Sequence, residues 1–148
     1  MAFDVDQLLQ MSKAQLDDLF TKSEAGPIPD GEAKGTAIIS PGTNFTKEMA
    51  EFVSHFAWQG KTFNSARGVL TNRISILGLN AIVATVYKGE SWFDGKECTV
   101  LDYSQTSLLA KWIRDEIRQI QPDMYLGRVY WGKKPLIHFA LEFNSSAA

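Results

Sequence analysis

The sequence predicts an α+β protein that is mostly antiparallel β-structure, with a curled sheet or small β-barrel, N-terminal helices and one late inserted helix. A change of pattern along the chain carries this prediction. Apolar residues recur at helical spacing near the start, whereas after about residue 60 they alternate with polar residues in short runs separated by glycine-containing turns. A chain of 148 residues that is 45% hydrophobic and 22% charged also predicts a single domain, 1–148, with a frayed tail at 144–148.

The N-terminal segment 1–22 is expected to be helical, in two pieces. Ser12-Lys13-Ala14-Gln15 has the pattern of a capping box, in which the side chains of the first and last residues bond each other's backbone N–H groups. The segment 25–31 is rich in glycine and proline, so it predicts a loop laid over the body of the protein. A short strand over 36–40 and a helix over 46–58 are expected to follow.

The middle of the chain is expected to be a series of short strands joined by tight turns, of which Asp94-Gly95 is a strong hairpin signal. After these strands, the apolar residues between Leu108 and Ile120 are spaced as in an amphipathic helix, which Pro122 would end. The expected strands lie at 62–65, 68–73, 80–87 and 97–103. An antiparallel sheet on a chain of this size commonly closes into a barrel, and a barrel of about eight strands has room for one small ligand.

The last two expected strands, 124–131 and 136–143, form a hairpin. A turn centred on 133–134 would place Trp131 opposite Leu136. In that register one face is almost entirely apolar, which predicts that it faces the interior of the sheet. This face consists of Met124, Leu126, Arg128, Tyr130, Ile137, Phe139, Leu141 and Phe143.

Arg128 is the one charged residue on this predicted inner face, so it needs a partner. One interpretation is a bound carboxylate, because a guanidinium fork fits two carboxylate oxygens and Tyr130 points the same way. The alternatives are that Arg128 reaches the rim of the barrel or pairs with an acidic residue such as Asp102. A register shift of one residue would turn His138 and Glu142 inward instead.

The leading functional hypothesis is therefore a protein that binds a small hydrophobic molecule, such as a fatty acid or an aromatic acid, inside a barrel. Arg128 and Tyr130 would hold the polar end of the ligand. The apolar walls would be Leu126, Phe139, Leu141 and Val83.

Two other classes of function remain open. The first is a small barrel enzyme, an isomerase, cyclase or hydrolase of an apolar substrate, with His138, Asp102 and Tyr103 as acid–base groups beside Arg128. The second is a domain without a pocket, whose aromatic surface binds a protein partner or a second copy of the chain as a homodimer.

Composition argues against several partners. With 15 basic and 17 acidic residues the net charge is −2, which disfavours nucleic acid, and no apolar run is long enough for a membrane helix. Cys98 is the sole cysteine, and with only His55 and His138 as histidines no disulfide, metal site or nucleophilic thiol is predicted. The glycines have no phosphate-binding spacing, so no cofactor is expected. The lone cysteine and the absence of a signal-like segment at 1–6 favour the cytoplasm.

Several short motifs follow one another in a suggestive order. Gly31-Glu32-Ala33-Lys34-Gly35 precedes Trp58-Gln59-Gly60-Lys61-Thr62-Phe63, and then come Ala81–Ala84, Leu101–Tyr103, Ile113–Asp115 and Tyr125–Arg128. This order, across about residues 18–143, resembles that of small bacterial lipocalin-like proteins of unknown function with Gly-x-Trp-x-Gly and Trp-x-Gly-Lys-x-Phe elements. Ala33 stands where the first element has Trp. The resemblance implies a calycin-type barrel that binds an apolar molecule, with no established reaction. Arg128-Val129-Tyr130 is also similar to the Arg-x-Tyr element with which intracellular fatty-acid-binding proteins hold a carboxylate.

Overall fold

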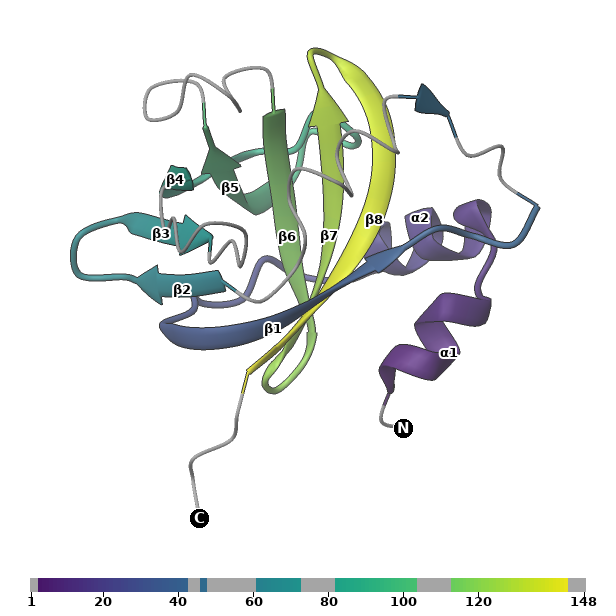
Figure 1. Ribbon diagram of the computed structural model, residues 1–148, viewed down its shortest axis with the longest axis horizontal. Helices are drawn as coiled ribbons and strands as arrows, with labels where there is room; N and C mark the ends of the chain where they lie inside the picture. The colour runs from purple at the N-terminus through teal and green to yellow at the C-terminus, as the bar shows by residue number, and fades with distance from the viewer. Residues whose placement is uncertain (1–2, 43–45, 48–60, 73–81, 104–112, 144–148) are drawn as a thin grey trace.

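The computed structural model describes residues 3–42, 46–47, 61–72, 82–103 and 113–143 (Figure 1). The described ranges contain two helices, α1 (Val5–Gln10) and α2 (Lys13–Lys22), followed by eight strands. The strands are β1 (Gly31–Ile38), β2 (Lys61–Asn64), β3 (Val69–Asn72), β4 (Ile82–Glu90), β5 (Glu97–Asp102), β6 (Ile113–Gln121), β7 (Met124–Trp131) and β8 (Lys134–Phe143).

The eight strands form a closed antiparallel barrel, in which each strand pairs with the next and β8 returns to pair with β1. The prediction of a curled, mostly antiparallel sheet is therefore confirmed. The expected strands between residues 62 and 103 correspond to β2–β5, with ends that differ by a few residues, and β1 begins earlier than expected, at Gly31. The expected helix over 46–58 and the expected tail at 144–148 lie outside the described residues, apart from 46–47.

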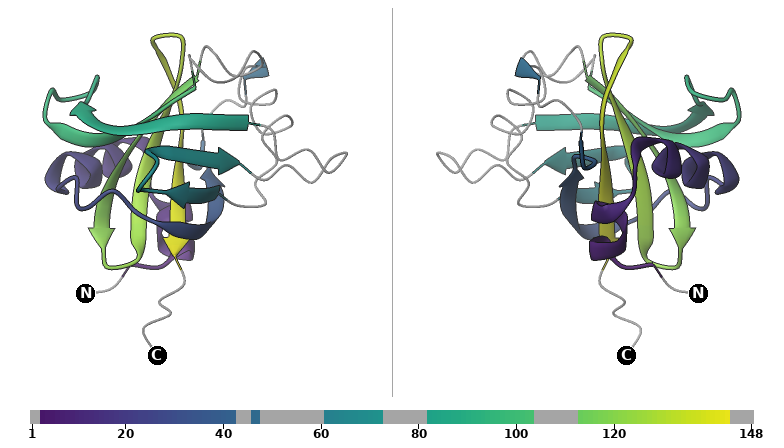
Figure 2. Two further views of the ribbon diagram at one scale, coloured as in Figure 1. Left: turned by 90° about the vertical axis from the view of Figure 1, so that its left-hand side faces the viewer. Right: turned by 90° about the vertical axis from the view of Figure 1, so that its right-hand side faces the viewer.

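The two N-terminal helices form as the sequence predicts. The Ser12–Gln15 capping box is present, and Asp4 and Gln7 form a second one at the start of α1. Both helices lie against the outside of the barrel wall (Figure 2). Leu8, Leu16 and Phe20 point from them toward the outer face of the strands, where they pack on Ile38, Cys98, Val100, Met124, Leu126 and Ala140. The wall under the helices is consequently buried on both of its faces.

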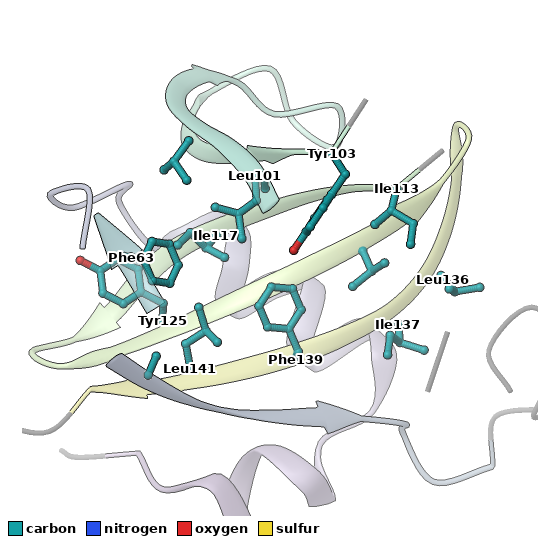
Figure 3. Close-up of a cluster of buried hydrophobic side chains, with 14 residues drawn as sticks. Phe63, Leu101, Tyr103, Ile113, Ile117, Tyr125, Leu136, Ile137, Phe139 and Leu141 are labelled. Carbon is teal, nitrogen blue, oxygen red and sulfur yellow. The ribbon is translucent and has the colours of Figure 1, made fainter. Parts of the chain in front are cut away.

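The barrel interior holds the larger apolar cluster (Figure 3). Phe139 on β8 lies near its centre, and Gly127 is its direct neighbour on β7. The Phe139 ring occupies the space that a side chain at position 127 would need. The described members of the cluster are Ala33, Phe63, Ala84, Val86, Leu101, Tyr103, Ile113, Ile117, Tyr125, Val129, Leu136, Ile137, Phe139 and Leu141.

The expected late helix is wrong for its second half, because residues 113–121 form β6 and not a helix. Residues 104–112 lie outside the described part of the chain. Ile113 and Ile117 both face the barrel interior, a spacing of four residues that fits one face of a helix and one face of a strand equally well. The alternate residues Arg114, Glu116 and Arg118 face outward and are paired there, as described below.

The predicted register of the last hairpin is also wrong, by two residues next to the turn and by one residue beyond the bulge. The turn is centred on Gly132 and Lys133, with Trp131 opposite Lys134 and a bulge between Arg128 and Tyr130. Gly132 has a φ of +65°, a left-handed conformation that glycine adopts without steric cost. With this shifted register, the side chains of β8 face the sides that were predicted, whereas those of β7 face the opposite sides. Tyr125 and Val129 point inward. The outward residues of β7 are Met124, Leu126, Arg128 and Tyr130.

Candidate functional site

A pocket of about 590 Å³ lies outside the barrel, between α2, the β4–β5 loop (residues 91–96) and the end of the β7–β8 hairpin. It combines aromatic rings with charged groups, a composition typical of sites for small molecules. The described residues that line this pocket are Lys13, Asp17, Trp92, Phe93, Arg128, Tyr130, Lys133 and Pro135.

Arg128 forms the floor of the pocket. It lies on β7 directly opposite His138 of β8, and only 4% of its surface is exposed. Its Nη1 contacts the carboxylate of Asp17 on α2, and its Nε donates to the Tyr130 hydroxyl at 3.4 Å. No hydrogen bond joins its Nη2 to any of the described residues, which leaves the two N–H groups on that atom for water or a ligand.

Asp17 and His138 form a hydrogen-bonded pair beside Arg128, with 2.9 Å between Oδ1 of Asp17 and Nε2 of His138. Burial lowers the pKa of His138, and the attraction of Asp17 does not restore it, so the ring is neutral at pH 7. In that state Nε2 carries the proton and donates to Asp17. Burial alone would raise the pKa of Asp17, but the hydrogen bond from His138 and the charge of Arg128 together bring it below its usual value. Asp17 is consequently ionised and balances the charge of Arg128.

The β4–β5 loop is fastened to the barrel by Glu116 of β6. This carboxylate is fully buried and accepts hydrogen bonds from the Ser91 hydroxyl and the Trp92 backbone N–H, both at 2.7 Å. Arg114 completes the arrangement with a 3.1 Å ion pair to the same carboxylate. A buried carboxylate is tolerated only when it is satisfied in this way.

Arg118 is the second fastening of the loop. Its guanidinium binds both oxygens of Asp94 at 2.7 Å and also donates to the backbone carbonyls of Glu97 and of Phe20 at the end of α2. The hydrogen bond from Arg118 lowers the pKa of Asp94 to about 2, against the effect of burial. The loop and α2 are thus held to the same strand, which fixes the distance between two walls of the pocket.

The loop presents two aromatic rings, and each has a guanidinium on one face. The Cζ of Arg128 lies 3.9 Å from the centre of the Phe93 ring, and that of Arg114 lies 4.2 Å from the Trp92 ring. Trp92 also meets Tyr130 edge to face at 5.2 Å between ring centres. Trp92 and Phe93 nevertheless stay 48% and 40% exposed. A wall of fixed, half-exposed rings can therefore contact the apolar part of a ligand.

The ligand residues predicted from the sequence divide between two faces of the barrel wall. Phe139 and Leu141 lie in the interior cluster, as expected, whereas Leu126 packs under the helices and Arg128 and Tyr130 line the outer pocket. The prediction that Arg128 carries its charge into the barrel interior is wrong, because the register slip turns β7 over. Its alternative partner Asp102 is also not its partner, since Arg128 pairs with Asp17. Val83 lies in β4, and its side chain is outside the described part.

The predicted acid–base residues do not gather at one place. His138 contacts Arg128 at 3.3 Å and is 5% exposed. Tyr103 lies in the interior cluster, and Asp102 accepts a hydrogen bond from the Tyr87 hydroxyl on the outer face. In the described ranges, an enzyme built on all of these groups therefore has no common cavity.

The remaining candidates give no reactive site in the described ranges. Cys98 is fully buried, and burial raises the pKa of its thiol to about 12. Within the described ranges no three His, Cys, Asp or Glu side chains gather closely enough to hold a metal ion. Neither α1 nor α2 has the length and apolar content needed to cross a bilayer. His55 lies outside the described residues.

Sequence reasoning missed most of the pocket. The sequence places Lys13 within the capping box and Asp17 on the outer face of the second N-terminal helix, and no local pattern assigns either of them, or Trp92 and Phe93, to a site. One signal was available: two large rings stand immediately before the Asp94-Gly95 turn, where a solvent-exposed loop ordinarily carries polar residues.

Comparisons with known proteins support the fold alone. No protein-family model matches the chain, and the search of curated proteins finds no match. Among solved structures, the chain is similar to the crystal structure of a protein from Thermomonospora curvata, with a TM-score of 0.62 and 18% sequence identity over 90% of this chain and 88% of that one. The chain therefore shares the architecture of a curled antiparallel sheet with that protein.

Proposed function

We propose that this barrel protein binds a small acidic molecule with an aromatic or otherwise apolar body, and that the site is the pocket outside the barrel. The observation that carries the proposal is Arg128, a buried guanidinium whose Nη2 has no hydrogen-bond partner among the described residues and which lies at the floor of an aromatic pocket. A cation in that position costs free energy unless an anion or water completes its hydrogen bonds. The class of ligand is the one that the sequence suggests, but the proposed site lies outside the barrel and not in its interior.

The shape of the site favours a ring over a long alkyl chain. Trp92, Phe93 and Tyr130 offer ring faces and edges that contact a planar molecule over a large area. Because Arg114 and Arg128 already hold one face of the two loop rings, these rings are fixed before the ligand arrives. Binding then costs little side-chain entropy.

The interior of the barrel is a poorer location for the same ligand. Fourteen described apolar residues pack together in the interior, where Asp115 is a buried charged residue on the inward face of β6, and the ring of Phe139 fills the space over Gly127. Arg128 and Tyr130, the polar residues on which the sequence hypothesis rested, are on the other side of the wall.

Calorimetric titration with benzoate, 1-naphthoate and decanoate tests the proposal. We expect 1-naphthoate to bind most tightly and Arg128→Gln to weaken it at least about tenfold, the cost of a hydrogen bond to a charged group. Arg67→Gln is the control, because Arg67 is an exposed arginine in the β2–β3 turn. Trp92→Ala is a second variant that removes a half-exposed ring without emptying the core. Absence of binding by all three acids, or equal affinities of the Arg128 and Arg67 variants, contradicts the proposal.

A further inference from the structure

The charges around the pocket do not cancel. Four of the described lining residues carry a formal charge: Lys13, Arg128 and Lys133 are basic and Asp17 is acidic. Asp17 is in direct contact with Arg128 through Nη1, so these two charges compensate each other. The nearby His138 is neutral and adds nothing. The pocket therefore has two positive charges in excess, in a protein whose overall net charge is −2.

The two excess charges belong to Lys13 and Lys133, and they come from different walls. Lys13 is the first residue of α2, and Lys133 lies in the turn between β7 and β8. Neither lysine side chain forms an ion pair or hydrogen bond with any residue in the described ranges, whereas the side chains of Lys22 and Lys88 each contact an acidic side chain. Two unpaired ammonium groups in the same pocket as a buried guanidinium create a local positive potential that attracts a multiply charged anion.

The donors of the site suit a group with three acceptor oxygens. A carboxylate offers two oxygens in one plane and one negative charge, which Nη2 of Arg128 alone can meet. A phosphate monoester offers three terminal oxygens and a charge between about −1.5 and −2 at pH 7. Arg128, Lys13 and Lys133 approach from β7, α2 and the hairpin turn, so each can meet a different oxygen.

On these grounds we infer that the acidic group of the ligand is a phosphoryl dianion on an aromatic body, with Lys13 and Lys133 selecting the second negative charge. This inference rests on the proposed function and deepens it. Arg128 provides the hydrogen bonds at the floor, the rings hold the body of the ligand, and the two lysines distinguish a phosphate monoester from a monocarboxylate.

Calorimetric titration with matched probes tests the inference. Phenyl phosphate and benzoate share a ring and differ in charge, and inorganic phosphate has the charge without the ring. In the unsubstituted protein we expect phenyl phosphate to bind about five- to tenfold more tightly than benzoate, from two screened charge interactions. The double variant Lys13→Ala/Lys133→Ala is expected to reduce this preference to within about twofold. Lys34→Ala is the control, because Lys34 is an exposed lysine on β1 that does not line the pocket.

Each outcome separates the inference from the proposed function. Equal affinity for phenyl phosphate and benzoate, or a preference that survives loss of both lysines, overturns the inference and leaves the acid site in place. Binding of inorganic phosphate as tight as that of phenyl phosphate also overturns it, since the rings then contribute nothing. Binding to phosphatidic acid vesicles without binding of phenyl phosphate assigns the lysines to a membrane surface and overturns the inference as well. Failure of every probe, 1-naphthoate included, contradicts the proposed function itself.

Discussion

Replacing Gly127 by alanine tests the packing of the barrel interior. Gly127 on β7 lies directly opposite Phe139 on β8, and the phenyl ring extends across it. A Cβ at position 127 would lie within 2.6 Å of three carbon atoms of that ring, whereas ordinary contacts begin at 3.4 Å. The Phe139 ring must therefore move by roughly 1 Å, against neighbours that leave it no exposed surface.

The expected cost follows from two opposing effects. Overpacking a well-packed core typically costs about 1–3 kcal/mol, and the upper end applies here because Phe139 is completely buried. Alanine also loses less backbone entropy on folding than glycine, which returns about 0.5–1 kcal/mol. We therefore expect Gly127→Ala to lower the free energy of unfolding by about 2 kcal/mol.

Urea unfolding followed by circular dichroism measures this difference. Gly89→Ala on β4 is the control. Its Cβ would meet one methyl group of Val100 at 3.1 Å and the Tyr87 ring at an ordinary 3.5 Å, so the change should cost less than about 1 kcal/mol. Combining Gly127→Ala with Phe139→Leu should cost less than the sum of the two single changes, because a smaller side chain makes room for the methyl group. A loss below about 0.5 kcal/mol for Gly127→Ala, or strict additivity in the double variant, would refute this description of the interior.

Two further predictions concern titratable groups. The folded protein holds the pKa of His138 below 6.5, so the unfolded chain takes up this proton first, and stability that is present above pH 6.5 is lost as pH falls toward the folded pKa. Urea unfolding should therefore show that the free energy of unfolding falls less between pH 7 and pH 5 for His138→Gln than for the unsubstituted protein. An equal fall in both proteins would contradict the assignment of His138 as buried and neutral. Cys98, whose pKa is raised to about 12 in a fully buried site, should not react with an aryl disulfide reagent until the protein unfolds. Rapid modification under native conditions, followed by absorbance, would contradict this burial.

Local patterns were enough to predict the architecture from the sequence. The Ser12–Gln15 capping box and the alternation of apolar residues depend on neighbours in the chain, and both are present in the fold. The segment around β6 failed because polar and apolar residues do not alternate regularly along it. Asp115 is buried on the same face as Ile113 and Ile117, and Ile120 packs on the outer face with the helices. The strand is covered on both faces, so its sequence lacks the alternation that marks a half-buried strand.

The site could be predicted only in part, because its residues meet through long-range geometry. Arg128 and Tyr130 were identified as a pair that would bind an acid, on the basis of their types and spacing. The face on which they lie depends on the register, which the turn at Gly132 shifts by two residues and the bulge between Arg128 and Tyr130 brings back to a shift of one. Asp17 is 111 residues away from Arg128 in the chain, so no local pattern connects them.

The manner in which β6 holds the loop at 91–96 has an evolutionary consequence. Glu116 and Arg118 hydrogen-bond to this loop at the Ser91 hydroxyl, the Trp92 backbone N–H and the Asp94 carboxylate. In the described ranges, no hydrogen bond involves the side-chain rings of residues 92 and 93. Those two ring positions can therefore be exchanged while the loop backbone keeps its place. Under the proposed function, substitutions at positions 92 and 93 would change the ligand preference of a related protein while these loop contacts stay in place.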